Sequence, residues 1–523
     1  MATRDHIIVG SGINALVCAA MLSAKSRVTV LEREAVAGGT MRSGTLHPGF
    51  TYDPMAATFV LFQAAPAFAA LEADLTRHGL AFSKTGHPTG VLMSDGRALA
   101  MSNDRAANVA AFDALHPGDG AHYAAEMAGI EANAALIFGL FNSALWTRDM
   151  AMQLGKAAFR MGPRGLAAFF GEALVTNRRR LSTAFGSDLV AALHAPWPLH
   201  AGLTPEQPFS GKMGEVMAFA LEAIGASIAT GGAARVAEAL VALIEERGGS
   251  VRTDADVDAV LADGAHRTRG VRLSDGEEIA GRSVICSVTP TQLYGRLLRE
   301  WKVPADIRAA VRRYQYGRGD MQIHYALERP VDWPDPALAD VQLLHLSDGL
   351  NAVSKASNEA ERGLLPERPT VCVGQPSAAD PSRAPEGKAV LWLQIPDCPT
   401  TILGDAAGTI DIPSDGRWSE TVREAYADRV EAMIAAHVPD FRDTVIVRKV
   451  LSPADLERMN INLVGGEPYG GACGLDQSFL FRPFTGQVNH KTFAPGVYHI
   501  GASTHPGPGL SGTSGYLLAK ALS

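Results

Sequence analysis

Apolar and helical stretches alternate in a regular order over the first forty residues of the chain. Residues 6–9 form a short apolar run that predicts a buried strand, and residues 13–24 have the pattern of a helix. A second apolar run at residues 28–31 predicts another strand, which leads directly into Glu32. Strand, helix and strand in this order predict a βαβ unit with two parallel strands.

Two later stretches continue this part of the fold. Residues 233–247 predict a helix, and residues 250–257 lead into a hairpin that turns at Asp275-Gly276. Apolar residues 284–288 then predict a strand, and a terminal helix begins at about residue 513. These stretches extend the predicted α/β arrangement along the chain.

The intervening stretches have other patterns. Residues 90–225 begin with a hairpin that turns at Asp95-Gly96 and continue as helix-prone segments rich in Ala, Phe, Leu and Met. Residues 296–465 contain alternating runs at 321–327, 341–346 and 390–395, which predict an antiparallel sheet, and then a helix over 419–437 with Ser419 as N-cap. We therefore predict a discontinuous α/β domain (1–89, 226–295 and 466–523) and an inserted domain (90–225 and 296–465) of antiparallel sheet plus helices.

Glycines at the first strand–helix turn match a nucleotide-binding fingerprint. Gly10, Gly12 and Ala15 fit G-x-G-x-x-G/A, and Glu32 lies 22 residues after Gly10, close to the usual spacing of about 20. Gly10 permits the tight turn, and Gly12 lets the backbone approach a pyrophosphate. The helix N-terminus offers N–H groups and the positive end of its dipole to the phosphates. Glu32 would accept from ribose hydroxyls, which argues against the 2′-phosphate of NADP.

A second glycine pair decides between two nucleotides. Gly38-Gly39 follow Glu32 in the motif ERxxxxGG, and Arg42 comes soon after. An NAD-binding unit has no need of glycines here. Flavoproteins of the glutathione-reductase-like superfamily do, because their chain passes close to the FAD pyrophosphate and ribitol. The pattern therefore predicts noncovalent FAD as the cofactor.

Composition narrows the class of protein. The chain has 523 residues, 47% hydrophobic and 20% charged, and a net charge of −8, which argues against nucleic acid as a partner. The triplet Arg178-Arg179-Arg180 is typical of a solvated face, although beside an apolar region it could also contact anionic lipid. Five scattered cysteines form no C-x-x-C, so we expect reduced thiols and no metal site.

No uninterrupted apolar run reaches the roughly 18 residues of a membrane span. The nearest, residues 132–146, is interrupted by Asn142 and Ser143. Because a predicted strand begins at His6, we also expect no signal peptide. These patterns predict a cytoplasmic protein that is soluble or peripherally associated with a membrane.

The motifs taken together resemble a known family. GSGINAL at 10–16, ERxxxxGG at 32–39, PGFTYD at 48–53 and GASTHPGPG at 501–509 are similar to those of the phytoene-desaturase type (bacterial carotenoid desaturase-like) of FAD oxidoreductase. The chain resembles even more the phytoene-dehydrogenase-related and pyridine nucleotide-disulfide oxidoreductase domain proteins of the flavin amine oxidase superfamily. The resemblance covers both ends and the central α/β piece and is weak across 105–225 and 296–465. It implies a glutathione-reductase-like Rossmann FAD domain with an inserted substrate domain.

The resemblance also implies which residues hold FAD. Each group of residues would contact one part of FAD. The implied groups are Gly10, Ser11, Gly12 and Asn14 at the pyrophosphate; Glu32 and Arg33 at the adenosine ribose; Gly38, Gly39 and Thr40 along the ribitol and phosphates; Val257 at the adenine; and Gly501, Gly509, Leu510 and Ser511 at the isoalloxazine. The terminal helix would point its N-terminus at the flavin N1–C2=O edge. Many relatives have an acid where this chain has Ala502, which weakens that ribitol contact or passes it to Ser503.

A second G-x-G-x-x-G match occurs at 507–512, but the chain ends eleven residues later. A strand and an acid cannot follow it, so we predict no separate NAD(P)H site. The flavin would then exchange electrons with the substrate, oxygen, a quinone or a redox protein. The sequence makes no prediction of oligomeric state.

Few catalytic side chains are required, because flavin N5 can itself accept a hydride. His505 is the one titratable residue that the motif ties to the flavin face, where it could position substrate or move a proton. The alternative is that His505 packs locally in its Pro-Gly turn. Asp53 caps a turn or lies near the ring.

We therefore predict an FAD-dependent oxidoreductase of the desaturase or dehydrogenase type. Its expected substrate is a large apolar molecule, of which a polyene or isoprenoid is the leading example, bound between the two domains. The helical part, 105–225, is the expected membrane-contacting region. Three alternatives remain: a flavin amine oxidase, a reductase or isomerase without net oxidation, and a non-catalytic lipid-binding escort protein of the same fold.

Overall fold

A five-stranded parallel sheet forms the centre of the α/β part in the computed structural model, which describes residues 5–523. The strand order is β21 (Val497–Ile500), β13 (Ser283–Ser287), β1 (Asp5–Val9), β2 (Arg27–Leu31) and β9 (Ser250–Arg252). Every neighbouring pair is parallel. The predicted βαβ unit is confirmed, with α1 spanning Ile13–Ser23.

Each face of this sheet is covered by a different layer. Ile8 and Ile285 pack in one core with α1, α11 (Ala234–Glu246) and α18 (Thr513–Leu522). Ile7 and Val284 point to the other face, where a three-stranded antiparallel sheet covers them. That sheet contains β10 (Val257–Ala262), β11 (Thr268–Leu273) and β12 (Glu278–Ala280). The predicted turn at Asp275-Gly276 joins its last two strands.

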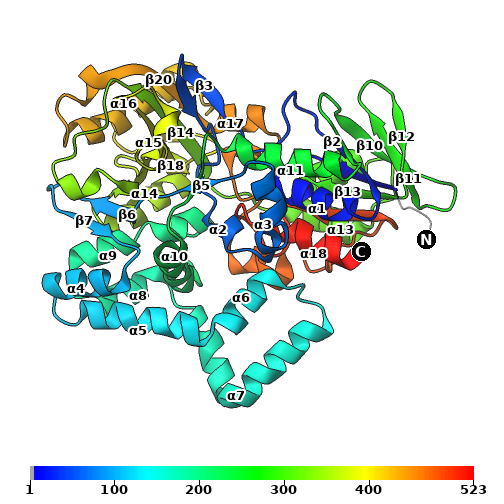
Figure 1. Cartoon of the computed structure of the whole chain (residues 1–523), viewed down its shortest axis with the longest axis horizontal. Helices are drawn as coiled ribbons and strands as arrows, with labels where there is room; N and C mark the ends of the chain where they lie inside the picture. The colour runs from blue at the N-terminus through cyan, green and yellow to red at the C-terminus, as the bar shows by residue number, and fades with distance from the viewer. Residues whose placement is uncertain (1–4) are drawn as a thin grey trace.

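The second sheet has seven strands and lies beside the α/β part that contains the parallel sheet (Figure 1). Its order is β20 (Val445–Leu451), β14 (Gly319–Leu327), β18 (Ala389–Cys398), β17 (Val371–Gly374), β15 (Val341–Leu346), β6 (His87–Leu92) and β7 (Ala98–Met101). Helix α16 (Glu420–Ala435) packs on one face, and its N-cap Ser419 accepts from the Val422 amide, as predicted.

One pair in this sheet corrects the prediction of an antiparallel sheet. β6 and β15 are parallel, whereas the other pairs are antiparallel. The reason is that the β6–β7 hairpin comes from an earlier piece of the chain and joins the edge left by β15. Parallel neighbours require such a long connection.

Residues 105–225 form helices and no strand. These are α4 (Arg105–Leu115), α5 (Asp119–Ala132), α6 (Ala134–Asn142), α7 (Arg148–Ala173), α8 (Asn177–Ala184), α9 (Asp188–His194), the 3-10 helix η1 (Trp197–Ala201) and α10 (Ser210–Ile224). Helix α7 extends away from the body of the molecule, and α6 lies between α7 and that body (Figure 1); the two helices are called the arm below. Gly162-Pro163 bends α7, because Gly162 has non-helical dihedral angles.

The remaining α-helices and strands connect or cover these layers. They are β3 (Gly44–His47), β4 (Phe50–Tyr52), α2 (Val60–Gln63), α3 (Pro66–Arg77), β5 (Phe82–Ser83), β8 (Ile228–Ala229), α12 (Pro290–Gln292), α13 (Ala305–Arg313), α14 (Leu350–Glu361), β16 (Leu364–Leu365), α15 (Pro376–Ala379), β19 (Gly404–Asp405) and α17 (Pro453–Met459).

Of the basic triplet, only Arg180 is buried, whereas Arg179 is exposed and Arg178 is partly exposed. Arg180 is buried and pairs with Glu126, and Arg178 pairs with Glu206 at 2.7 Å. Two of the three charges are therefore neutralised within the protein. Among residues 5–523, no single helix is long and apolar enough to cross a bilayer; the bent pair α5 and α6, at 62°, meets the requirement only in combination.

Candidate functional site

A cavity of about 300 Å³ lies at the carboxyl ends of the parallel strands. Val9, Leu31, Ser287 and Gly501, at or just after the ends of β1, β2, β13 and β21, all line it. This edge of a parallel sheet is where α/β folds bind nucleotides. We call it the main cavity.

The glycine loop leaves open space on its cavity side. Gly10 has φ +90°, and a Cβ on it would lie 3.2 Å from the Ser287 carbonyl oxygen. A Cβ on Gly39 would lie 3.0 Å from the Gly12 Cα. A Cβ on Gly12 itself would meet no protein atom within 4 Å, and no side chain caps the N-terminus of α1 there. The first turn of α1 is therefore open to an anionic ligand.

Glu32 is fixed at the end of β2 by three donors. Its carboxylate accepts from the Ser11 amide at 2.9 Å, the Ser11 hydroxyl at 2.5 Å and the Glu34 amide at 3.0 Å. The Ser11 hydroxyl in turn accepts from the Gly38 amide at 2.8 Å. Glu32 therefore lines the cavity in one orientation, and Ser11 ties the two glycine segments together.

The structure brings most of the predicted cofactor residues together. Those that line the main cavity are Gly10, Ser11, Gly12, Asn14, Glu32, Arg33, Gly39, Thr40, Val257, Gly501, Gly509 and Leu510. Gly38 lies behind Ser11, and Ser511 lines a different cavity. The Asn14 side chain accepts from the Gly515 amide at 3.3 Å, which joins α1 to α18.

His505 does not line the main cavity, which corrects its interpretation as the catalytic residue. It lines a hollow of about 20 Å³ with Trp146 and Phe479. Its Nε2 donates to the Ser143 carbonyl at 3.0 Å, and burial lowers its pKa to about 4. Its side chain turns toward the base of the arm, so local packing accounts for it. Asp53 accepts from the Ala233 amide at 2.9 Å and caps the turn before α11.

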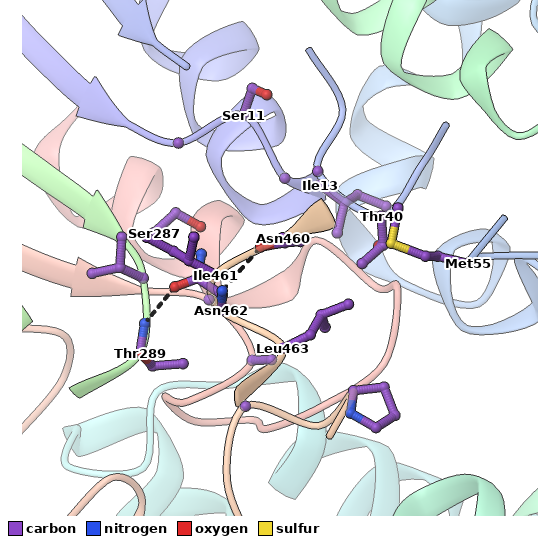
Figure 2. Close-up of a pocket in the computed structure, with 18 of the residues that line it drawn as sticks. Ser11, Ile13, Thr40, Met55, Ser287, Thr289, Asn460, Ile461, Asn462 and Leu463 are labelled. Carbon is purple, nitrogen blue, oxygen red and sulfur yellow. Dashed lines mark hydrogen bonds between the residues drawn. The ribbon is translucent and has the colours of Figure 1, made fainter. Parts of the chain in front are cut away.

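One segment of the main cavity was not predicted. Residues 460–463 lie beside the end of β13, where Asn462 accepts from the Thr289 amide at 3.1 Å (Figure 2). Thr40 and Met55 lie across from them in the same view. These residues follow no motif, so only the tertiary structure places them at the site.

A buried carboxyl group lines the main cavity on its sheet side. Asp320, on β14, lines it together with Gln322 and Gln394. Burial raises the pKa of Asp320 to about 8, because its charged form loses water. The alternation of Asp320, Gln322 and His324 with apolar residues was a sequence signal of a polar strand face, but not of a site.

A second cavity, of about 160 Å³, adjoins the first and is mainly apolar. We call it the apolar cavity. His200 and Gly509 line both cavities, so the two meet there. Its walls include residues of α2, the arm and α10, together with the N-cap residue of α10: Leu61, Phe138, Phe141, Phe209, Met213, Val216 and Met217. A ligand with a long apolar chain could therefore reach the main cavity.

His200, His345 and Cys372 also come together, although no sequence spacing predicts it. Their potential ligand atoms all lie within 4.8 Å of one another. The two Nε2 atoms share a hydrogen bond of 2.9 Å, and His345 Nδ1 has no partner among residues 5–523. Metal-binding imidazoles normally donate their other N–H to an acceptor. The cluster is better described as part of a polar surface on the sheet.

Comparison with known proteins finds a family that matches most of the chain. A family described as flavin containing amine oxidoreductase matches residues 16–447. The chain is 26% identical over 548 residues to pyridine nucleotide-disulfide oxidoreductase domain-containing protein 2 of Mus musculus, across 98% of this chain and 92% of that protein. It is 25% identical over 358 residues to the zeta-carotene-forming phytoene desaturase of Myxococcus xanthus, across 67% and 62%.

Solved structures share the fold. An oxidoreductase from Methanosarcina mazei superposes with a TM-score of 0.61 at 15% identity, across 99% of this chain and 100% of that one. Wild-type putrescine oxidase bound to putrescine also gives a TM-score of 0.61, at 14% identity, across 99% of both chains. These neighbours have mixed α/β architecture, in agreement with the predicted fold class.

Proposed function

Since the chain belongs to the flavin containing amine oxidoreductase family and is an FAD-dependent oxidoreductase, we propose that it removes or shifts hydrogens on a large apolar substrate. Family membership confirms the resemblance inferred from the motifs and confirms FAD as the cofactor. The non-catalytic escort alternative does not fit a family of oxidoreductases. The substrate and the direction of the reaction are the new part of the proposal.

The residues of the main cavity fit FAD. The space beyond Gly12 is free of protein atoms, and α1 begins there without a side-chain cap, as a pyrophosphate requires. Glu32 is held in place to accept from ribose hydroxyls, and Val257 at the start of β10 would lie by the adenine. When bound, FAD supplies an acceptor for two electrons and a hydride. The electrons would then pass to oxygen, a quinone or a redox protein.

The apolar cavity is the observation that carries the substrate proposal. Phe138, Met213 and Met217 are among its walls, and it meets the main cavity at His200 and Gly509. Such walls stabilise hydrocarbon by about 0.8 kcal/mol for each buried CH₂ group. They also exclude water from the entrance to the flavin. A polyene or isoprenoid is the leading guess within this class, supported by the match to phytoene desaturases.

An amine oxidase is the second candidate, because one observation favours it. Asp320 places a carboxyl group in the main cavity, where it could accept from an amine. An amine oxidase for short polar amines would not need the apolar cavity. A reductase or isomerase would use the same two cavities as a dehydrogenase.

We also propose that the arm rests on a lipid surface, from which an apolar substrate would enter. Phe159 on α7 is 95% exposed, and Trp146 and Met152 nearby are more than half exposed. Helix α7 carries four basic and two acidic side chains in a protein of net charge −8. Exposed apolar residues next to basic ones are typical of contact with anionic bilayers. Phe138 and Phe141 of the arm line the apolar cavity, so the arm forms part of its wall.

A wall variant tests the substrate proposal. Met213→Glu places a charge in the apolar cavity but not in the main cavity. We expect 1-decanol to bind the variant at least tenfold more weakly than the parent by calorimetry, with unchanged FAD content. Met152→Glu, on the exposed face of the arm, is the control and should bind decanol normally. Equal decanol binding by Met213→Glu contradicts the proposal.

A matched pair of surface variants tests membrane contact. Phe159→Glu should reduce sedimentation with vesicles of phosphatidylglycerol and phosphatidylcholine, and added salt should weaken binding of the parent. Leu403, 74% exposed in the loop before β19, is the control. Leu403→Glu should sediment like the parent. If the parent itself does not sediment, the lipid-contact proposal is wrong.

A further inference from the structure

A row of polar side chains crosses the buried face of the seven-stranded sheet. Gln322 on β14 is directly opposite Gln394 on β18, and Gln394 is opposite Cys372 on β17. Cys372 is in turn opposite His345 on β15. Directly opposite residues point to the same face of a sheet, so these four side chains form one row.

The two faces of this part of the sheet differ in chemistry. Met321, Ile323 and Leu393, which alternate with members of the row, pack in the apolar core with α16. Cys372 and His345 are at most 1% exposed, and Gln322 is 2% exposed. Buried polar side chains cost free energy unless they are paired, so a row of them on an interior face needs a physical reason.

Asp320 extends the row into the main cavity. It lies two residues before Gln322 on the same strand, and both line the cavity with Gln394. Its Oδ2 accepts from the side-chain amides of Gln322 at 2.8 Å and Gln394 at 2.9 Å. The Gln322 oxygen accepts from the Trp392 indole, which fixes the orientation of that amide.

The other oxygen of Asp320 is buried without a hydrogen-bond partner in the described part of the chain. Asp320 is 3% exposed, and its Oδ1 makes no hydrogen bond within residues 5–523. A buried oxygen without a partner costs about 1–3 kcal/mol. Asp320 is held by two amides, lines the main cavity and has one oxygen without a partner among residues 5–523, so its carboxyl group is placed to meet a ligand there.

We propose that Asp320, Gln322 and Gln394 bind a hydrogen-bond-donating group, a hydroxyl or a protonated amine, at one end of the otherwise apolar substrate. The proposal rests on the proposed function, because it takes the apolar cavity as the site of the remaining chain. It narrows the substrate class from hydrocarbons to amphipathic molecules with one polar end. A pure hydrocarbon would leave Asp320 Oδ1 unpartnered and buried.

The charge state of Asp320 agrees with this assignment. Burial raises its pKa to about 8, so the carboxyl is largely neutral near pH 7. A hydroxyl can accept from the neutral carboxyl group or donate to the ionised carboxylate, which only accepts. An amine can take its proton and form an ion pair.

Ligands that differ only in the donor test the proposal on the FAD-loaded protein. The probes are 1-decanol, decylamine and 1-methoxydecane, which keeps the oxygen of decanol but lacks its hydrogen. At about pH 9, where most of the Asp320 carboxyl is ionised and only accepts, calorimetry should show decanol or decylamine binding at least tenfold more tightly than the ether. The ratio of decanol to decylamine affinity distinguishes the two donor groups. Equal affinity of all three probes would overturn the assignment of Asp320 while leaving the apolar cavity intact.

The variant Asp320→Asn provides a second test of the proposal. Its oxygen can accept from Gln322 and Gln394, but its NH₂ then faces the cavity, so a donor gains no partner. We expect the preference for decanol over the ether to fall to less than threefold, because the oxygen of either probe can accept from that NH₂. Retained preference in a folded variant overturns the proposal. Absence of binding by every probe to the parent instead contradicts the proposed function, on which this inference rests. If Asp320→Asn does not fold, the comparison of the three probes on the parent protein still tests the proposal.

Discussion

Replacement of Gly12 by alanine separates cofactor binding from folding. Gly12 has φ −64° and ψ 170°, which alanine adopts without strain, and its Cβ would meet no protein atom within 4 Å. The free energy of unfolding of the FAD-free protein should therefore stay unchanged or rise by up to about 1 kcal/mol. The added methyl group lies where the pyrophosphate approaches the backbone. Overpacking of this kind costs about 1–3 kcal/mol, so FAD should bind roughly 5- to 150-fold more weakly.

Two other glycines provide controls for this experiment. Gly129 lies within α5, and a Cβ there also meets no protein atom within 4 Å, so Gly129→Ala should leave FAD affinity unchanged. Gly39 has φ +61°, and its Cβ would lie 3.0 Å from Gly12 Cα, so Gly39→Ala should destabilise the FAD-free protein as well. FAD affinity is measured by flavin fluorescence and stability by urea unfolding. If Gly12→Ala binds FAD as tightly as the parent, the pyrophosphate does not lie there.

Three further predictions concern the two ends of the main cavity and the electron donor. Glu32→Ala should weaken FAD binding by about 1–3 kcal/mol. It should also destabilise the FAD-free protein, since Ser11 and the Glu34 amide lose their acceptor. Unchanged FAD affinity in a fluorescence titration would contradict this prediction. Because burial raises the pKa of Asp320 from 3.8 to about 8, the folded parent binds its proton more tightly than the unfolded chain, and its stability falls as pH rises through that range. Asp320→Asn should therefore gain about 1–3 kcal/mol of stability relative to the parent between pH 5 and pH 7 in urea unfolding, and a pH-independent difference would refute the buried-acid assignment. Anaerobic NADH or NADPH should leave the flavin oxidised, and fast saturable bleaching by either would show that a nucleotide site was missed.

Local sequence patterns correctly predicted those elements whose formation depends on residues close together in the chain. The βαβ unit with Gly10 and Gly12 and the N-cap at Ser419 were all predicted, because each depends on residues a few positions apart. The parallel pair of β6 and β15 was not, because residues 87–92 and 341–346 meet only after the whole inserted domain has folded. Register between distant strands has no local signature.

In the candidate site, too, residues that belong to a local motif were predicted, whereas residues brought in by tertiary structure were not. Glu32 and its glycine loop follow a motif, and the structure places them in the cavity. His505 is near Gly501 in sequence, but its side chain turns toward Ser143 at the base of the arm. Proximity along the chain therefore did not predict direction in space. Asp320 was missed because the cross-strand register, with Gln322 opposite Gln394, decides which polar strand positions meet the cavity.

Anaerobic titration of the FAD-loaded protein with fractionated cell extracts tests the central claim most directly. Loss of the flavin absorbance reports reduction by a substrate. An apolar fraction containing amphipathic molecules should bleach the flavin, and Met213→Glu should slow that reaction while leaving FAD content unchanged. Bleaching by short, water-soluble amines, with no response to any apolar fraction, would contradict the apolar-substrate account and establish the amine oxidase alternative.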